Sequence, residues 1–174
     1  EAQISDDLEG EIHTYEQWNQ GEVFAGTQRK ISVYLPPSGY GDEPLSLLIF
    51  NDGEAYRSDR GPVRVPRVLE YLLKQGELRP TAAIFVMPGV PEKAALESDN
   101  QVRYHLAHRQ RSFEYDSCTP LYGEFLLRDV LPLCSANCRL NLHQTLPAAV
   151  YAVFPAAVCA RSMQLGISLD NLHG

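Results

Sequence analysis

Hydrophobic and polar residues alternate in the first part of the chain. The alternation is irregular over 11–18 and clean over 29–35, where Ile31, Val33 and Leu35 share one face. A period of two is typical of a strand with one buried face. We therefore expect these segments to form an antiparallel pair of strands with one face in water.

A different pattern follows, in which apolar residues run without interruption over 45–50 and again over 81–87. Such runs are typical of strands buried on both faces. Residues 66–76 between them place apolar side chains at helical spacing, with Pro66 in the first turn and Gly76 at the end. The order strand, helix, strand predicts a βαβ unit in a parallel sheet with helices on both faces.

The rest of the chain is less regular. Residues 1–10 are polar and acidic and are expected to form a flexible lead-in to a single domain over 11–174. Residues 89–119 show little periodicity and predict a long loop, of the kind that is often functional. Residues 121–131 predict an amphipathic helix that ends at Pro132.

The last forty residues change character, because they are rich in alanine, valine and leucine and poor in acidic residues. Residues 148–154 are compatible with a buried strand and residues 163–172 with a short helix. This part of the predicted domain, residues 134–174, carries three of the four cysteines.

Composition and charge exclude several classes of protein. The chain has 174 residues and a net charge of −7, so it is a poor candidate for binding nucleic acid, and no apolar run is long enough to cross a membrane. Cys134 and Cys138 have only His143 nearby as a further ligand type, so we expect no metal site. We expect reduced thiols and a cytoplasmic location; one disulfide in a secreted protein is the alternative.

The clearest candidate site is the sequence Asn-Asp-Gly-Glu at 51–54, directly after the first buried strand. Ligands of open α/β sheets bind beyond the carboxyl ends of the strands. Gly53 permits a tight turn whose backbone N–H groups could stabilise an oxyanion. The alternative is a simple β-turn made of good turn residues.

A second candidate is the segment 109–116, where arginines stand beside aromatic and acidic residues. It could bind an anionic or polar substrate, or it could hold a surface loop together through salt bridges. His105 and His108 could act as a base or as ligands, or they could be solvated loop residues.

No nucleophile can be identified by motif. A serine hydrolase of this architecture uses a G-x-S-x-G turn, and the chain contains none. Ser162 and Cys159 follow the last predicted strand and are the candidate catalytic residues, although neither is flanked by glycines. P-loop and G-x-G-x-x-G motifs are also absent, which excludes nucleotide binding by those routes.

Five segments in series resemble the α/β-hydrolase family that includes enterochelin esterases and esterase-D-like enzymes. They are RKISVYLPP at 29–37, LLIFNDG at 47–53, AIFVMP at 83–88, RSFEYD at 111–116 and FLLRDVLP at 125–132. The resemblance covers residues 11–133, about the first half of such a domain. It implies an α/β-hydrolase-like three-layer sandwich with a mostly parallel sheet, an antiparallel N-terminal pair and a truncated end.

The resemblance also implies the chemistry of a serine esterase. Serine attacks a carboxylic ester of a small molecule, histidine transfers the proton and backbone N–H groups hold the oxyanion, without any cofactor. Gly53 and Glu54 would belong to the oxyanion hole. A substrate-side loop would contain four further residues: Asp52, Arg111, Glu114 and Tyr115.

The sequence departs from the family between 134 and 162, where the nucleophile turn should fall, and resembles it again at 163–168. A change of reading frame would explain this pattern. Two further readings stay open beside the esterase. One is a non-catalytic remnant or binding module that completes its sheet with another copy, as a homo-oligomer. The other is a hydrolase that uses Cys159.

Overall fold

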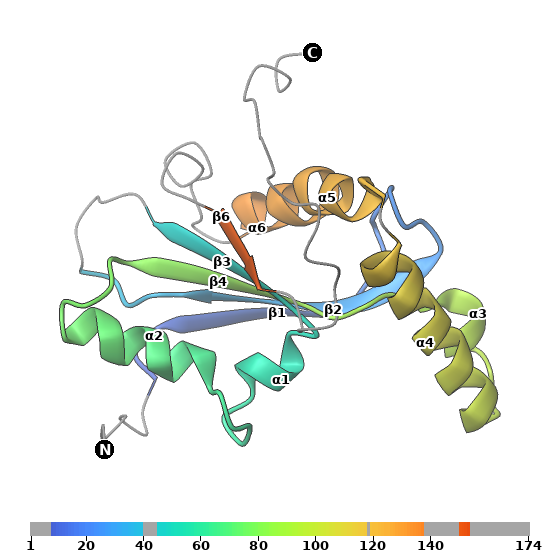
Figure 1. The fold of residues 1–174 in the computed structure, drawn as a ribbon, viewed down its shortest axis with the longest axis horizontal. Helices are drawn as coiled ribbons and strands as arrows, with labels where there is room; N and C mark the ends of the chain where they lie inside the picture. The colour runs from blue at the N-terminus through green and yellow to red at the C-terminus, as the bar shows by residue number, and fades with distance from the viewer. Residues whose placement is uncertain (1–7, 40–44, 118, 138–149, 154–174) are drawn as a thin grey trace, which may run out of the picture.

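A computed structural model describes residues 8–39, 45–117, 119–137 and 150–153 (Figure 1). The strands are β1 (Glu11–Trp18), β2 (Thr27–Leu35), β3 (Ser46–Asn51), β4 (Thr81–Val86), β5 (Val90–Pro91) and β6 (Val150–Val153). The helices are α1 (Glu54–Arg57), α2 (Val65–Lys74), α3 (Glu92–Ala95), α4 (Asn100–Asp116), α5 (Leu121–Phe125), the π-helix η1 (Leu126–Val130) and α6 (Leu131–Asn137).

The strands form one sheet in the order β1-β2-β4-β3-β6, with the short β5 paired to the start of β2. The predicted antiparallel pair is confirmed as β1 and β2, and the predicted βαβ unit as β3, α2 and the parallel β4. The prediction of a mostly parallel sheet was wrong for the described residues, where the sheet is mixed. The reason is that β2 lies between β1 and β4 and runs antiparallel to both.

Helices cover both faces of this sheet (Figure 1). On one face, Tyr34 and Phe85 pack with Val65 and Leu69 of α2. On the other face, α5, η1 and α6 cover the side chains of alternate strand residues, including Ile31. The helices leave β1 partly exposed but bury β2 on both faces, so the expected wet face belongs to β1 alone.

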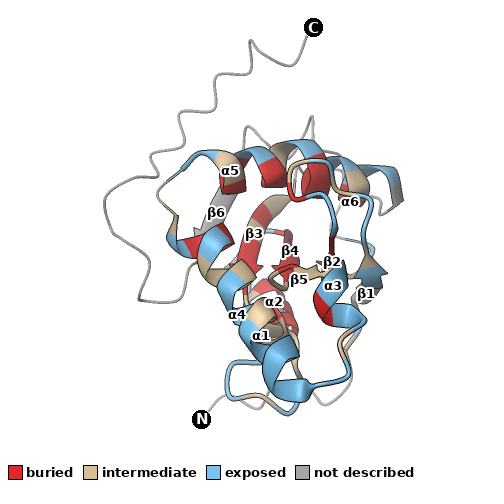
Figure 2. Cartoon of the chain, turned by 90° about the vertical axis from the view of Figure 1, so that its right-hand side faces the viewer, coloured by how far each residue is buried: buried red, intermediate tan, exposed pale blue. Residues whose placement is uncertain are grey.

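The prediction of a long loop over 89–119 was wrong, because this segment contains α3 and the 17-residue α4. The Asp99 carboxylate caps α4 by accepting hydrogen bonds from the amides of Gln101 and Val102. Only Glu114 and Tyr115 of α4 are buried, and most of the helix is exposed (Figure 2). Hydrophobic periodicity reports the burial of a face, and α4 has little face to bury.

The predicted helix end at Pro132 was also wrong, since α6 continues to Asn137. A proline inside a regular α-helix clashes with the carbonyl group four residues earlier. Here the wider turn of η1 lies directly before α6. Such a π-helical turn displaces the carbonyl groups that precede Pro132, which lets the helix pass through the proline.

The ordered domain includes residues just before β1. The buried Glu70 carboxylate of α2 accepts hydrogen bonds from the amides of Glu9 and Gly10, at 3.1 and 2.5 Å. A Cβ atom at Gly10 would lie 2.5 Å from the carbonyl oxygen of Leu35, so only glycine fits this approach. Of the predicted lead-in, residues 1–7 lie outside the described residues.

The strand predicted over 148–154 is present as β6, which runs parallel to β3 and pairs Val153 with Phe50. Cys134 of α6 is buried in the core. The predicted helix at 163–172, with Cys138, Cys159 and Ser162, lies outside the described residues. In the described part of the chain, none of the helices combines the length and the apolar surface that crossing a membrane requires.

Candidate active site

The turn after β3 lies at the C-terminal end of this strand, beside the C-terminal end of β4. Asp52 adopts a left-handed conformation with φ of 52°, and the next residue begins to wind into α1. A Cβ atom at Gly53 would lie 2.5 Å from Cβ and 2.6 Å from Cα of Phe85, so the turn packs directly against the backbone of β4. Glycine is required here by close approach, because its own φ is an ordinary −55°.

The two predicted N–H donors of this turn differ in what they bind. The Gly53 amide donates to the carbonyl oxygen of Val86 at 3.1 Å and is therefore engaged by β4. Among the described residues, the hydrogen-bond partner of the Glu54 amide is the sulfur of Met87, at 3.3 Å. A thioether is a weak acceptor. Of the two N–H groups, that of Glu54 would therefore more readily exchange its present partner, the Met87 sulfur, for a stronger acceptor.

The Glu54 side chain lies between two cations. Lys30 is 3.2 Å away, and the Arg57 guanidinium is 2.5 Å away. Burial raises the pKa of Glu54, but hydrogen bonds from Arg57 and Lys30 and their charges outweigh it and hold the pKa below its usual value. The carboxylate beside the turn is therefore ionised at neutral pH and balanced by two positive charges.

Arg111 of α4 binds the same turn through Asp52. Its Nε and Nη2 atoms donate to the two oxygens of Asp52, at 3.0 and 2.6 Å. Its guanidinium carbon also lies 5.2 Å from the centroid of the Tyr115 ring. The hydrogen bond to Asp52 is the main reason that the pKa of Arg111 is raised. The pair is partly exposed, so it borders solvent at the edge of the site.

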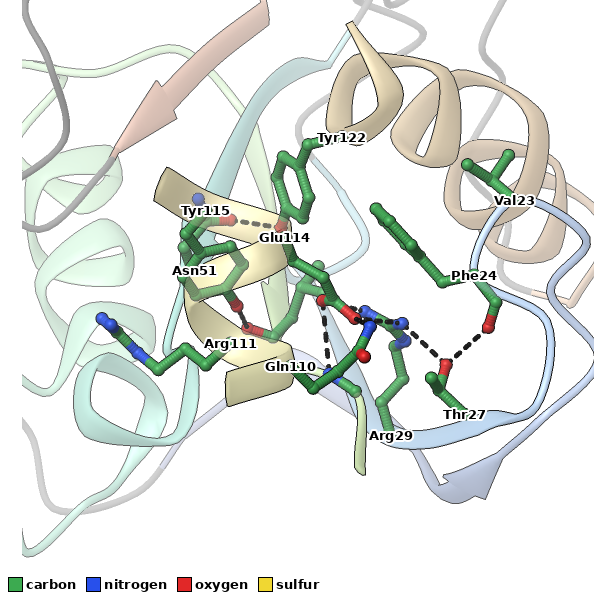
Figure 3. A network of polar contacts seen from close by, with 12 residues as sticks. Val23, Phe24, Thr27, Arg29, Asn51, Gln110, Arg111, Glu114, Tyr115 and Tyr122 are labelled. Atoms are coloured by element: carbon green, nitrogen blue, oxygen red, sulfur yellow. Dashed lines mark hydrogen bonds and ion pairs between the residues drawn. The ribbon is translucent and has the colours of Figure 1, made fainter. Parts of the chain in front are cut away.

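Glu114, predicted to line the substrate side, is completely buried and lies within a network of polar contacts, which Figure 3 shows. Its two oxygens accept from Nη1 and Nη2 of Arg29 at 2.8 and 2.9 Å. They also accept from the Gly89 amide at 3.3 Å and from the Gln110 side chain at 2.9 Å. Because both oxygens are saturated and sealed from solvent, this carboxylate faces the interior rather than a ligand.

A second buried polar pair lies at the end of β3. Tyr122 of α5 donates to Oδ1 of Asn51 at 2.6 Å, while Nδ2 of Asn51 has no partner in the described structure (Figure 3). Tyr115 packs edge-on against Tyr122, and its hydroxyl lies 3.5 Å from the carbonyl oxygen of Val86. Burial is the main cause that raises the pKa of both tyrosines, so both hydroxyls are neutral at physiological pH.

The sequence found part of this arrangement. Asp52, Gly53, Glu54 and Arg111 come together at one edge of the sheet, and Tyr115 lies beside them. The sequence predicts Asn51 only as a turn residue, and it does not predict the roles of Arg29 and Tyr122. The one feature of the sequence that pointed to Arg29 is its place in RKISVYLPP at 29–37, the first of the five segments that resemble the esterases. No pattern signalled Tyr122.

Other candidates from the sequence are placed away from this edge or are not described. His105 and His108 lie on the exposed part of α4, where His108 packs against Tyr104. No group of three potential metal ligands occurs among the residues that the structure describes. Ser162 and Cys159 fall outside the described residues.

Comparison with known proteins gives matches in structure only. No protein-family model matches the chain, and no curated protein matches it. A crystal structure of the enterobactin esterase from Shigella flexneri in the presence of enterobactin matches with a TM-score of 0.50 and 16% identity. The match covers 76% of this chain and 27% of the esterase.

The same esterase in the presence of 2,3-dihydroxy-N-benzoyl-glycine gives a TM-score of 0.50 and 17% identity, covering 79% and 28% of the two chains. A ferulic acid esterase matches with a TM-score of 0.47 and 16% identity over 84% of this chain and 51% of its own. The chain thus spans about a quarter of the length of the first esterases that it matches. At the level of the fold, the two enterobactin esterase structures confirm the resemblance to an N-terminal portion of the esterases.

Proposed function

We propose that this chain is part of an α/β-hydrolase-like serine esterase that acts on a small-molecule carboxylic ester. In this proposal the described elements belong to a three-layer sandwich that a complete esterase extends further. The observation that carries the proposal is the turn after β3. It combines a weakly engaged Glu54 amide with an Asp52 that Arg111 holds by two hydrogen bonds.

Ester hydrolysis needs donors at the position where negative charge develops. When a nucleophile attacks an ester carbonyl, its oxygen becomes an oxyanion that accepts strong hydrogen bonds from fixed N–H groups. We assign this role to the Glu54 amide, because exchanging a thioether for an oxyanion costs it little. Gly53, whose amide is taken by Val86, serves instead to let the turn approach β4.

The nucleophile that we propose follows β6. This strand runs parallel to β3, and its last residue, Val153, pairs with Phe50, one position before Asn51. Ser162 and Cys159 follow β6 in the sequence and are the candidates for attack on the carbonyl carbon. The attack would displace the alcohol of the ester, which leaves with the proton of the nucleophile, and give an acyl-enzyme. Water would then hydrolyse the acyl-enzyme to the free acid and restore the nucleophile, a route that requires no metal or organic cofactor.

A fluorophosphonate probe tests this proposal directly. The intact mass of the folded chain is measured before and after treatment, and the modified peptide is mapped. We expect one adduct that is lost in Ser162→Ala and kept in the control Ser168→Ala. A different set of results would favour the cysteine: no probe adduct on any serine, labelling of Cys159 by iodoacetamide, and ester turnover that Cys159→Ser abolishes. Folded protein with neither reaction contradicts the esterase.

The absence of a G-x-S-x-G motif favours a second function, a non-catalytic binding module of the same fold. In the described sheet β6 lies at one edge. An edge strand can pair with another chain, and a second copy is the partner that we propose for it. If the fluorophosphonate probe does not react with the protein, sedimentation velocity tests this second function. We expect a dimer, and a monomer at every concentration contradicts the proposal.

A further inference from the structure

The buried ion pair between Arg29 and Glu114 connects α4 to the sheet. We propose that this pair is a positioning element of the site: it fixes α4 so that Arg111 reaches Asp52 and sets the turn that presents the Glu54 amide. This inference rests on the proposed function for the meaning of the turn, although not for its test. It gives Glu114 a role that differs from contact with substrate.

The spacing along α4 supplies the first step of the argument. Residues 111, 114 and 115 are three and four positions apart and therefore lie on one helix face. Glu114 and Tyr115 are the only buried residues of α4, so these two decide which face turns toward the sheet. Arg111 emerges from this face at the edge of the buried region, where it meets Asp52.

The contacts of Glu114 fix this orientation closely. Its carboxylate binds β2 through both terminal nitrogens of Arg29 and binds the segment before β5 through the Gly89 amide. Arg29 in turn stacks on Phe125, 4.2 Å from the ring centroid, and donates to the Thr27 hydroxyl at 3.0 Å. A rotation of α4 would break several of these hydrogen bonds, and the side chains of Arg29 and Glu114 are too deeply buried for solvent to replace them readily.

The turn itself needs an external hold. A left-handed conformation such as that of Asp52 is unfavourable for any residue with a side chain, although aspartate tolerates it better than most. Two charge-assisted hydrogen bonds from Arg111 stabilise this conformation from outside the turn. If α4 moves, these bonds weaken and the turn relaxes toward ordinary backbone angles.

Amide hydrogen exchange measured by NMR tests the inference without any need for activity. The probe is the Gly53 amide, which is hydrogen-bonded to Val86 next to Asp52. In Arg111→Lys, which keeps the charge but loses the two-point geometry, we expect exchange at Gly53 to be at least tenfold faster. The matched control on the same helix is Arg109→Lys, at an exposed position, with no change.

The decisive variant is Arg29→Lys, which keeps a buried cation but loses the bidentate contact. We expect it to accelerate exchange at Gly53 at least tenfold while the amides of α2 change less than twofold. Combined with Arg111→Lys it should add no further acceleration, because both changes release the same turn. Unchanged exchange at Gly53, equal acceleration throughout the chain, or fully additive effects would each overturn the inference.

Two further measurements complete the design. If Arg29→Lys does not fold, Gln110→Met removes only one hydrogen bond from Glu114, and we expect about threefold faster exchange at Gly53. Unchanged exchange in this variant would contradict the inference. If the wild-type chain hydrolyses p-nitrophenyl acetate, Arg29→Lys should lower kcat at least fivefold with KM unchanged. Absent hydrolysis would count against the proposed function alone, because the exchange results do not depend on it.

Discussion

Arg111 and Asp52 form a two-point ion pair between residues 59 positions apart, with nitrogen–oxygen distances of 3.0 and 2.6 Å. The pair joins α4 to the turn at the carboxyl end of β3. Two-point contacts of this kind fix orientation as well as distance, because the planar guanidinium matches the carboxylate. The pair therefore controls the geometry of the turn more than it adds to the stability of the chain.

Two substitutions at Asp52 separate backbone conformation from the ion pair. Both Asp52→Ala and Asp52→Gly remove the carboxylate, but only alanine keeps a Cβ atom at a φ of 52°. We expect the glycine variant to be more stable than the alanine variant by about 1 kcal/mol. Urea unfolding of the two proteins measures this difference, and equal stability would show that the left-handed conformation is lost in the variants.

Gly53→Ala should destabilise the chain, because the added Cβ atom would lie 2.5–2.6 Å from atoms of Phe85 in β4. Overpacking against backbone typically costs about 1–3 kcal/mol. Gly61→Ala is the matched control, since its nearest neighbour would be 3.1 Å away. Thermal unfolding of both variants gives the comparison. A stable Gly53→Ala protein would mean that the turn does not pack closely against β4.

The buried ion pair Arg29–Glu114 and the exposed ion pair Arg128–Glu22 should contribute very differently to stability. Glu114→Gln leaves the Arg29 cation buried without a charge partner, and we expect a loss of about 3–5 kcal/mol. Glu22→Gln breaks the exposed pair with Arg128 and should cost less than about 1 kcal/mol. Chemical denaturation of both variants checks this order, and similar losses would contradict the burial of the Arg29–Glu114 pair.

Stability should fall in alkaline solution because of two buried tyrosines. Burial raises the pKa values of Tyr115 and Tyr122 above that of an unfolded tyrosine, about 10. Above pH 10 the unfolded chain therefore loses protons that the folded chain keeps, so the free energy of unfolding decreases as pH rises. Their stabilising contribution is fully present below pH 10.

Tyr115→Phe should make the free energy of unfolding less dependent on pH between 10 and 11, because one of the two groups no longer titrates. The exposed Tyr104→Phe serves as the control and should follow the wild-type profile. Urea unfolding at pH 9, 10 and 11 provides the measurement. A Tyr115→Phe profile that coincides with wild type would show that this hydroxyl ionises in the folded chain as readily as in the unfolded one.

Local pattern was enough to predict the elements that bury a regular face. The alternation in 29–35 corresponds to β2, and the continuous runs at 45–50 and 81–87 correspond to β3 and β4, because strands buried on both faces carry apolar residues without a break. The helix expected over 66–76 is α2, whose apolar residues recur at helical spacing. The turn residues 51–54 predicted a candidate functional site at the C-terminal end of β3, because the residue types that form a turn are recognised from the local sequence alone.

Tertiary contacts decided the rest. Of the 17 residues of α4, only Glu114 and Tyr115 are buried, so the sequence has no hydrophobic periodicity there that would predict a helix. The sequence placed Glu114 with Arg111 on a substrate-side loop, whereas the fold turns Glu114 inward to Arg29 and Arg111 outward to Asp52. Charge and polarity are properties of a residue, but burial and pairing depend on partners 59 and 85 positions away, which only the folded chain brings together.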